Sequence, residues 1–427
     1  MDEKEKRIRA ITKVYYSNPK VLEAILKFAS GREVVPRYLE GFGKRPDSLQ
    51  YNSDIMGLVN KGATSFHSSE EIWTDPFSIS SEMSAEELNS IRKGWDLLID
   101  IDSPYFDLSK TLTLLILKEL ESYGVGNYGL KFSGNKGFHI IVSGKAFPEE
   151  YNGRKMNESF PDWPRAICRF LMKEVRAEYN KKAREVLGGV EKIKKKTKLS
   201  EDEITEALCP ECGRAAKKGR LVTYRCPEGE STITRRDVQT TKRRLKCTND
   251  WCAGVLEVEK EEPYFYCEYC KNVSSIKKIE EGKKGKVVYS DAGKSSGDYS
   301  GDFGEEVAGA KFGASDLVLV APRHLFRMPY SLHEKTGLAS VVLRKEELES
   351  FAPRDADPLK VKIRNYFPEN REEEAAQLLA DALEWSKKDS DIEEDMHKKK
   401  YKSYEKVDFS GVSESDFPAP IKKLLMG

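Results

Sequence analysis

Seven of the eight cysteines of the chain lie in one stretch, from Cys209 to Cys270. This clustering constrains the fold most, because closely spaced thiols in a reducing compartment are typical of metal ligands rather than disulfides. The N-terminus is charged from its second residue and no apolar run reaches about eighteen residues, so we expect a cytoplasmic protein without a membrane partner. We expect residues 205–275 to form a metal-stapled insertion in a larger domain.

The spacing of the cysteines predicts how they are grouped. Cys247-x4-Cys252 and Cys267-x2-Cys270 form two knuckles with fourteen residues between them. Two such knuckles are typical of a tetrahedral four-cysteine zinc ribbon, with structural Zn²⁺ bound by all four thiolates. An iron–sulfur cluster is the minor alternative.

An upstream knuckle leaves the number of zinc ions open. Cys209-x2-Cys212 is followed by CPEG, where only Cys226 is present and Gly229 stands in place of a fourth thiolate. Cys209, Cys212 and Cys226 are therefore candidate ligands of a second, incomplete ribbon. Alternatively, the Cys209 knuckle pairs with one of the later knuckles, because spacing does not fix connectivity.

Two carboxylates end an apolar run. In WDLLIDID, residues 95–102, Asp100 and Asp102 are two positions apart, and strand geometry places both side chains on one face. Close carboxylates need a cation, and hard divalent ions such as Mg²⁺ prefer oxygen ligands. The alternative is a solvent-facing pair at a strand end.

A glycine-containing turn follows in the segment LKFSGNKGFHIIVSG, which predicts strand, turn and strand over residues 130–144. Its glycines expose backbone N–H groups, and Ser133, Lys136 and His139 are potential donors to phosphate. An ordinary hairpin is the competing interpretation.

A basic segment supplies further candidates. Because the net charge is only +1, a binding site for a polyanion has to be a local cluster. Asp316 precedes this segment and is a candidate third carboxylate. The basic residues are Arg323, His324, Arg327, His333 and Lys335.

In this order, D-x-D, S-G-x-x-G-x-H and RHLFRMPYSLHEKTG resemble motifs of the small, catalytic subunit of archaeo-eukaryotic DNA primases, in particular archaeal ones. GKRPDSLQY and GATSFHSSEEIW, near residues 43–73, also match, and the resemblance covers about residues 30–185 and 314–350. It implies that Asp100, Asp102 and Asp316 bind two catalytic Mg²⁺ or Mn²⁺ ions. It also implies that the triphosphate is held by Ser133, His139, Arg327 and His333; we add Lys136, Arg323 and His324 as candidate nucleotide ligands.

The expected fold is α+β, a primase catalytic fold with a mixed sheet, a Cys-rich zinc-ribbon insertion and a helical C-terminal tail. We expect a discontinuous catalytic domain over 1–195 and 276–360, the insertion at 205–275 and a helical, partly disordered tail at 361–427. Neither a P-loop nor a Rossmann glycine motif is present in the sequence.

The resemblance implies primer synthesis on single-stranded DNA during replication, with nucleoside triphosphates as substrates and a primase large subunit as partner in a heterodimer. A repair or gap-filling polymerase on the same fold, or a template-binding relative without catalysis, are the alternatives. The insertion is either a structural staple or a grip on the template.

Overall fold

The computed structural model describes residues 3–39, 41–80, 82–197, 200–229, 231–237, 245–270, 303–309 and 320–388. The predicted third carboxylate, Asp316, and residues 389–427 of the predicted tail lie outside the described residues. Residues up to Leu383 belong to one compact unit. Compact packing therefore extends beyond residue 360, where the sequence predicted the catalytic domain to end.

A four-stranded antiparallel sheet carries the predicted motifs. Its strands are β5 (Leu97–Ile101), β6 (Gly129–Phe132), β7 (Phe138–Val142) and β16 (Val342–Leu343), in the order β16-β6-β7-β5. The two predicted strands around the glycine turn, and the one that carries Asp100, are confirmed. All three are almost fully buried, which explains their Leu, Ile, Val and Phe content.

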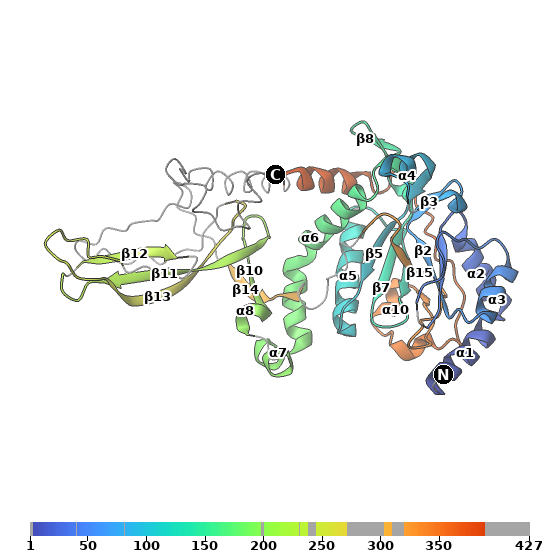
Figure 1. Ribbon diagram of the computed structural model, residues 1–427, viewed down its shortest axis with the longest axis horizontal. Coiled ribbons are helices and arrows are strands. Elements are labelled where there is room, and N and C mark those ends of the chain that lie inside the picture. The colour runs from blue at the N-terminus through green and yellow to red at the C-terminus, as the bar shows by residue number, and fades with distance from the viewer. Residues whose placement is uncertain are drawn as a thin grey trace, which may run out of the picture. The chain divides into compact units, whose positions relative to one another are not determined.

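Alternation along these strands gives the sheet two different faces. Phe132 and Phe138, which are register partners, pack against Phe106 of helix α5 (Phe106–Ser122). Helix α6 (Asp162–Leu187) packs beside α5, and both helices lie beside the sheet in Figure 1. Polar side chains on the opposite face are therefore kept away from the helices.

Helix α6 ends where the sequence dictates. Gly188 adopts a left-handed conformation with φ of 79°, which ends the helix after Leu187. The basic run that follows belongs to a separate helix, α7 (Val190–Thr197).

A second antiparallel sheet has the order β1-β2-β15, with β1 (Val34–Arg37), β2 (Ser65–Ser69) and β15 (Leu325–Arg327). It brings the basic segment beside a strand that lies far earlier in the chain. Phe326 of β15 lies 5.9 Å from the ring of His139 in the first sheet. The two sheets thus meet at the predicted site.

Two helices form the N-terminal segment, α1 (Glu3–Tyr16) and α2 (Pro19–Ala29). Asn18 caps α2 through a bond from the backbone N–H of Lys20. Tyr16 packs edge-on against Phe66 of β2, so α1 covers the second sheet.

Shorter helices and strands complete the part of the unit that lies outside the cysteine-rich segment. The helices are α3 (Asn52–Asn60), α4 (Ala85–Ile91), α10 (Lys345–Leu348), η1 (Pro76–Ser78), η2 (Gly144–Ala146), η3 (Met156–Glu158) and η4 (Pro353–Ala356). The strands are β3 (Glu71–Trp73), β4 (Arg92–Trp95), β8 (Glu150–Tyr151) and β9 (Arg154–Lys155). Residues 376–388 are helical, as the sequence predicted for that segment.

The cysteine-rich segment forms its own sheet, in the order β12-β11-β10-β14, with β13 also paired to β11. Its strands are β10 (Thr205–Leu208), β11 (Ala215–Arg225), β12 (Thr232–Asp237), β13 (Glu257–Tyr266) and β14 (Gly304–Val307), preceded by helix α8 (Glu201–Ile204). Because β14 pairs with β10, residues 304–307 belong with the insertion rather than with the segment 276–360 to which the sequence assigned them.

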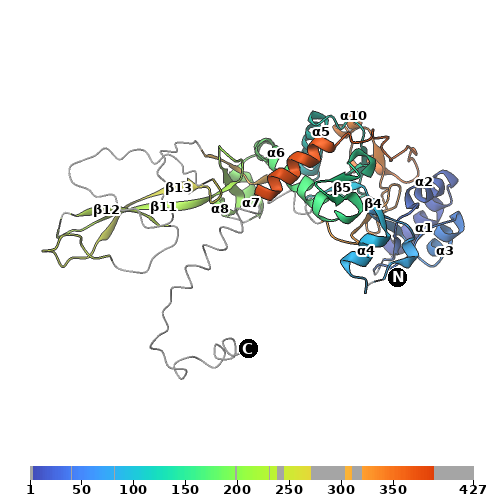
Figure 2. The ribbon, with the colours of Figure 1, turned by 90° about the horizontal axis from the view of Figure 1, so that it is seen from above.

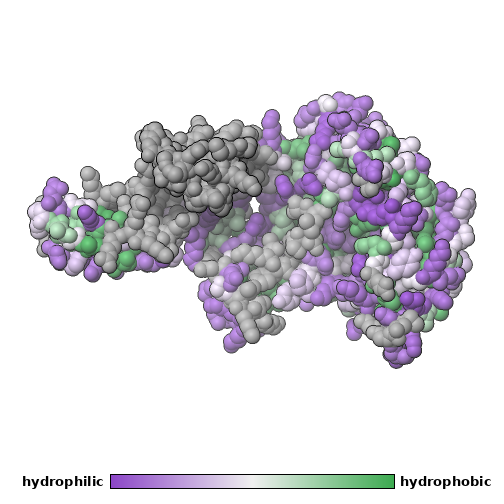
Figure 3. Space-filling view, in the orientation of Figure 1, coloured by the Kyte–Doolittle hydropathy of each residue, from purple (hydrophilic) through white to green (hydrophobic). Residues whose placement is uncertain are grey.

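The described surface is largely polar. Over the coloured part of the visible face, Figure 3 shows mostly hydrophilic residues, with hydrophobic residues in small separate patches, and Figure 2 shows the ribbon turned by 90°. None of the described helices combines the length and the apolar character needed to cross a membrane.

Candidate active site and cysteine clusters

Three polar side chains form one row across the first sheet. Asp100 of β5 is the register partner of His139 in β7, and His139 is the partner of Lys131 in β6. Side chains opposite each other on neighbouring strands share a face, so the row is set by strand pairing alone. His139 Nε2 lies 3.4 Å from Asp100 Oδ1, and Lys131 Nζ lies 2.9 Å from His139 Nδ1.

These contacts assign the tautomer of His139. Asp100 Oδ1 is a hydrogen-bond acceptor only, so the Nε2 atom that faces it carries the proton of the neutral ring, and Nδ1 accepts from Lys131 Nζ. Lys131 Nζ also bonds to Ser340 Oγ at 3.0 Å, and Ser340 Oγ in turn donates to the carbonyl of Phe132. His139 therefore presents an N–H donor beside Asp100.

Burial determines the charges of this row. Lys131 is fully buried and His139 is 4% exposed. Burial lowers the pKa of Lys131 well below its usual value, while Asp100 opposes that shift. Burial, with the nearby charges of Lys131 and Arg327, also lowers the pKa of His139 well below its usual value. His139 is thus a neutral hydrogen-bond donor at physiological pH.

Asp102 follows β5 directly and lies against the glycine turn. A Cβ built on Gly137 would lie 2.5 Å from the carbonyl of Ile101 and 3.2 Å from Asp102 Oδ1. Only glycine fits there. Asp102 is exposed and Asp100 is half-buried, and the two residues lie at the end of β5.

The glycine turn is held in place by the loop that contains His333. Ser133 and Gly137 close the turn through two bonds, and Thr336 Oγ1 donates to the carbonyl of Gly134 at 2.8 Å. Gly134 has a φ of 96°, and a Cβ there would lie 2.8 Å from Cβ of His333. Segments that the sequence predicted to act together are thus in contact.

His333 has a defined proton as well. Its Nδ1 accepts from the backbone N–H groups of Lys335 and Thr336, which leaves the proton on Nε2. Burial, together with the charge of Arg327, lowers the pKa of His333 to about 4. It is therefore a neutral donor at physiological pH, like His139.

Arg327 and His67 are register partners in the second sheet. Arg327 is 8% exposed and donates to Glu334 at 2.6 Å and to the carbonyl of Leu332 at 2.7 Å. His67 is 6% exposed, and Nδ1 of its ring has no hydrogen-bond partner among the described residues. Buried polar atoms usually have partners, so this nitrogen is available to a bound group.

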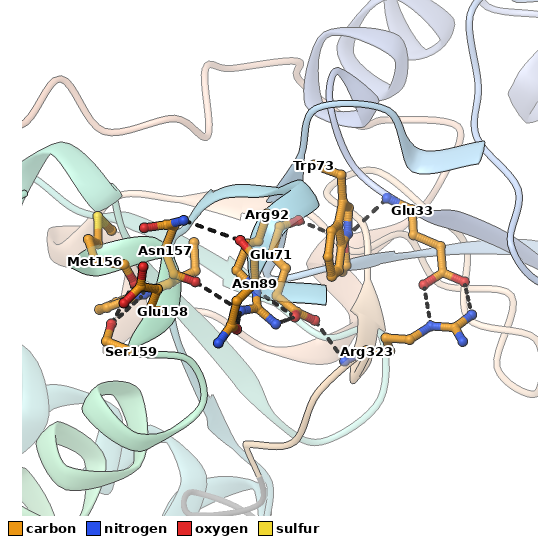
Figure 4. Close-up of polar contacts among 12 residues, drawn as sticks. Glu33, Glu71, Trp73, Asn89, Arg92, Met156, Asn157, Glu158, Ser159 and Arg323 are labelled. Carbon is orange, nitrogen blue, oxygen red and sulfur yellow. Dashed lines mark hydrogen bonds and ion pairs between the residues drawn. The ribbon is translucent and has the colours of Figure 1, made fainter. Parts of the chain in front are cut away.

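Arg323 and His324 are each bound to an acidic side chain. The guanidinium of Arg323 pairs with Glu33 at 3.0 Å, and its backbone N–H donates to Glu71 (Figure 4). His324 Nδ1 lies 2.9 Å from Glu70, and this contact raises the pKa of His324. The predicted nucleotide contacts of both residues stay predictions.

The acidic side chains of this site suit a hard divalent ion. Asp100 and Asp102 offer carboxylate oxygens at one strand end, a donor set typical of Mg²⁺ or Mn²⁺. His139 is neutral and its Nε2–H faces Asp100, so its ring adds no positive charge beside that carboxylate. The donor set therefore fits the implied metals, with Asp316 as a predicted third ligand.

The sequence did not single out Lys131, His67 or Glu334. A lone lysine inside the buried strand GLKF, or a lone histidine inside SFHSS, is a usable signal, because ionisable groups are seldom buried without a specific partner. Four of the five histidines lie in the part of the chain that the structure describes, and all four border this site.

The cysteines form two clusters, and the grouping differs from the main prediction. Cys209, Cys212, Cys267 and Cys270 lie together, and all four sulfurs are within 4.8 Å of one another. The prediction that Cys267 and Cys270 share a ribbon with Cys247 and Cys252 is therefore wrong. The antiparallel pairing of β11 with β13 brings the start of one strand beside the end of the other, which joins the first knuckle to the last. The alternative pairing of the Cys209 knuckle with a later one is confirmed.

The second cluster contains Cys226, Cys247 and Cys252, again within 4.8 Å. A hydrogen bond from Ser231 lowers the pKa of Cys247 to about 7. Both clusters can hold a metal ion of the kind that prefers thiolates, such as Zn²⁺.

Comparison with known proteins gives short or distant likenesses. No family model matches the chain. Over 78 residues, 18% of this chain, it is 33% identical to an uncharacterized protein of Methanocaldococcus jannaschii, and the match spans 17% of that relative. The polymerase domain of Ligase D from Mycobacterium tuberculosis, solved in complex with DNA, is similar with a TM-score of 0.32 and 11% identity, over 83% of this chain and 93% of that one. The function of the chain therefore rests on the geometry of its site.

Proposed function

We propose that the chain is the catalytic subunit of a DNA primase, which joins nucleotides on a single-stranded DNA template. The observation that carries this proposal is the meeting of Asp100 and Asp102 with three neutral or cationic donors, His139, Arg327 and His333, beside a glycine turn. Carboxylates for metals next to fixed donors for phosphates are what nucleotidyl transfer requires.

The glycine turn and the two histidines bind the triphosphate. The Nε2–H groups of His139 and His333 donate to phosphate oxygens, and both rings are held by bonds to their Nδ1 atoms. Fixed donors do not have to reorganise when charge develops in the transition state. Ser133 and Lys136 contribute further donors from the turn.

Asp100 and Asp102, with Asp316, hold the metal ions. Bound Mg²⁺ or Mn²⁺ supplies Lewis-acid stabilisation of the attacking 3′-hydroxyl and of the leaving pyrophosphate. The protein positions the α-phosphate beside the carboxylates, and Arg327, fixed by Glu334 and the carbonyl of Leu332, adds positive charge. Arg323 and His324 contact the nucleotide only if Arg323 releases Glu33 and His324 releases Glu70, so that each binds a phosphate oxygen instead.

The insertion contacts the template in this proposal. Trp251 is 77% exposed on the Cys247 knuckle, and the neighbouring Lys246 is also exposed. An exposed aromatic ring and an exposed basic side chain on one knuckle are typical of surfaces that stack on single-stranded bases. A primase large subunit completes the enzyme as a heterodimer.

Primer synthesis on single-stranded DNA tests the proposal. The purified chain is incubated with Mg²⁺ or Mn²⁺ and with ribonucleotides or deoxyribonucleotides, next to Asp100→Asn and Asp102→Asn variants of confirmed fold. New primers that are lost in both variants support a primase, and the productive nucleotide set gives its sugar preference.

Other outcomes overturn it in defined ways. Extension of a supplied primer without initiation, with or without added large subunit, indicates a repair or gap-filling polymerase. Template binding without any synthesis indicates a non-catalytic relative.

A further inference from the structure

The second cluster, Cys226, Cys247 and Cys252, is called the outer cluster from here on. Its three sulfurs have the hydrogen-bond donors that metal-bound thiolates have. Each accepts a hydrogen bond from a backbone N–H two or three residues further along the chain. The donors are Gly229 at 3.2 Å, Asn249 at 3.5 Å and Gly254 at 3.3 Å. Such N–H donors stabilise thiolate charge, and three thiolates this close need a cation.

Position 229 offers no fourth ligand, although it has the spacing of one. A Cβ built on Gly229 would lie 2.7 Å from Cys252 Sγ and 2.8 Å from Cys247 Sγ. The backbone itself therefore closes this side of the cluster. A structural zinc site is almost always four-coordinate, so the fourth ligand comes from another residue.

The carboxylate of Glu228 lies near the same cluster, although not within 4.8 Å of all three sulfurs. A Cβ built on Gly254 would lie 3.0 Å from Cys226 Sγ, 3.1 Å from Glu228 Oε2 and 3.2 Å from Cys252 Sγ. One carboxylate oxygen and two sulfurs thus border one small space, which is kept open because residue 254 has no side chain. Glutamate oxygen is an accepted ligand of Zn²⁺ next to thiolates.

Two other polar side chains nearby are already engaged. Ser231 Oγ bonds to Cys247 Sγ at 2.9 Å, and the amide of Asn249 donates to the carbonyl of Gly229. Both are neutral and stabilise the knuckle from outside. Asp250, exposed on the same loop, is the remaining acidic candidate in the described part of the loop.

We propose that the insertion binds two metal ions, and that the outer one is a distinct Zn²⁺ site formed by Cys226, Cys247, Cys252 and the carboxylate of Glu228. The inner ion is held by the four thiolates of Cys209, Cys212, Cys267 and Cys270. A site of three sulfurs and one oxygen has one hard ligand that exchanges more readily than thiolate, so the outer ion is released first when a chelator competes.

Metal content and release of the full chain test this proposal without any assay of activity. The wild-type protein, purified with zinc, is expected to contain two ions per chain by elemental analysis, and to release them to a colorimetric chelator in two separate phases. Glu228→Gln keeps the shape of the side chain and removes its charge. It is expected to accelerate the first phase about tenfold or more and to leave the second unchanged.

Asp250→Asn is the matched control, because it removes the same charge from an exposed side chain of the same unit. It is expected to release both ions as the wild type does. Replacement of zinc by Co²⁺ adds a second measurement: Glu228→Gln is expected to change the visible absorption of one cobalt ion and not of the other.

The inference fails if the chain holds one ion, if Glu228→Gln releases zinc at the wild-type rate with an unchanged cobalt spectrum, or if Asp250→Asn causes the change instead. Glu228 and Asp250 are exposed, so both variants are expected to fold even where a cysteine variant does not. Loss of primer synthesis has no bearing on any of these outcomes.

Discussion

Lys131 is a lysine without access to water, held between His139 and Ser340. Its hydrogen bonds go to these two side chains, and its effect on the reaction passes through the orientation and tautomer of His139. It is therefore a positioning residue. Burial of a lysine lowers the stability of the fold, so we expect such a lysine only where the histidine ring that it holds has a specific task.

We expect Lys131→Met to lower kcat for primer synthesis roughly 10–100-fold, with the fold retained, because a methionine fills the space but cannot donate to Nδ1. Nitrogen chemical shifts of the His139 ring should show a mixture of tautomers in place of Nε2–H alone. Lys118→Met, whose side chain is 73% exposed on α5, is the control and should leave both measurements unchanged. Wild-type kcat in Lys131→Met with the tautomer altered would remove Lys131 from the reaction.

At the scale of elements, the site depends on how closely the glycine turn approaches the loop around His333. Gly134 and Gly124 both have positive φ, 96° and 82°, so alanine strains the backbone at either position. A Cβ at Gly124 meets nothing within 4 Å, whereas at Gly134 it meets His333 at 2.8 Å. Alanine at Gly124 therefore tests backbone strain alone, whereas alanine at Gly134 adds a steric clash with His333.

We expect Gly124→Ala to lower the free energy of unfolding by about 1–2 kcal/mol and to leave activity intact. Gly134→Ala should cost more than this and should raise KM for the nucleotide, because the turn has to move away from His333. Denaturant titration and steady-state kinetics of both variants provide the check. Equal effects of the two substitutions on KM would show that the contact has no role in binding.

The pairing of Glu347 in α10 with Arg364 fixes the segment after residue 360 to the catalytic unit. This bidentate contact lowers the pKa of Glu347 to about 2. A carboxylate whose pKa is lowered in the folded state stabilises the fold at every pH above its pKa in the unfolded chain. This stabilisation is lost as the pH falls from about 4.5 to about 2.

Glu347→Gln should therefore be less stable than the wild type at pH 7, by less than about 1 kcal/mol because both side chains are partly exposed. The difference should shrink below about pH 4.5 and vanish near about pH 2. Thermal unfolding across this pH range measures it, with Glu346→Gln as the control for loss of one charge on the same helix. A difference that persists at the lowest pH would rule out the ion pair as its origin.

Helices and strands could be predicted from the sequence where a local residue pattern determines them. The site could be predicted only in part. Buried strands such as FHIIV and the helix of residues 162–187 follow from periodicity and caps. The row of Lys131, His139 and Asp100 depends on which strands pair, and pairing across the sheet is not encoded in spacing. The cysteine grouping was mispredicted for the same reason, because the β11–β13 register decides which knuckles meet.

At the scale of the whole molecule, the described chain has two kinds of interior. Around the carboxylates the core is built from side chains of two sheets and their helices, including Trp95, Ile99 and Phe132. In the insertion the buried residues are few and centre on cysteines, with Cys209, Cys267 and Phe303 in one cluster and Cys226, Ile233 and Leu256 in the other. Glu206 of β10 joins the two parts through Arg176 and Asn180 of α6.

Interiors this small are stable only with a cross-link or a metal. Removal of zinc by a chelator at neutral pH should therefore abolish the protection of backbone amides in β11, β12 and β13 from hydrogen exchange, while amides in β5, β6 and β7 stay protected. The buried contacts of Glu206 should confine the change, so that α6 keeps its protection. Hydrogen exchange followed by mass spectrometry resolves these segments, and re-addition of Zn²⁺ is the control for reversibility. Protection lost across both parts would mean that they unfold as one unit, and protection kept in both would mean that the thiolates do not hold the insertion together through a metal.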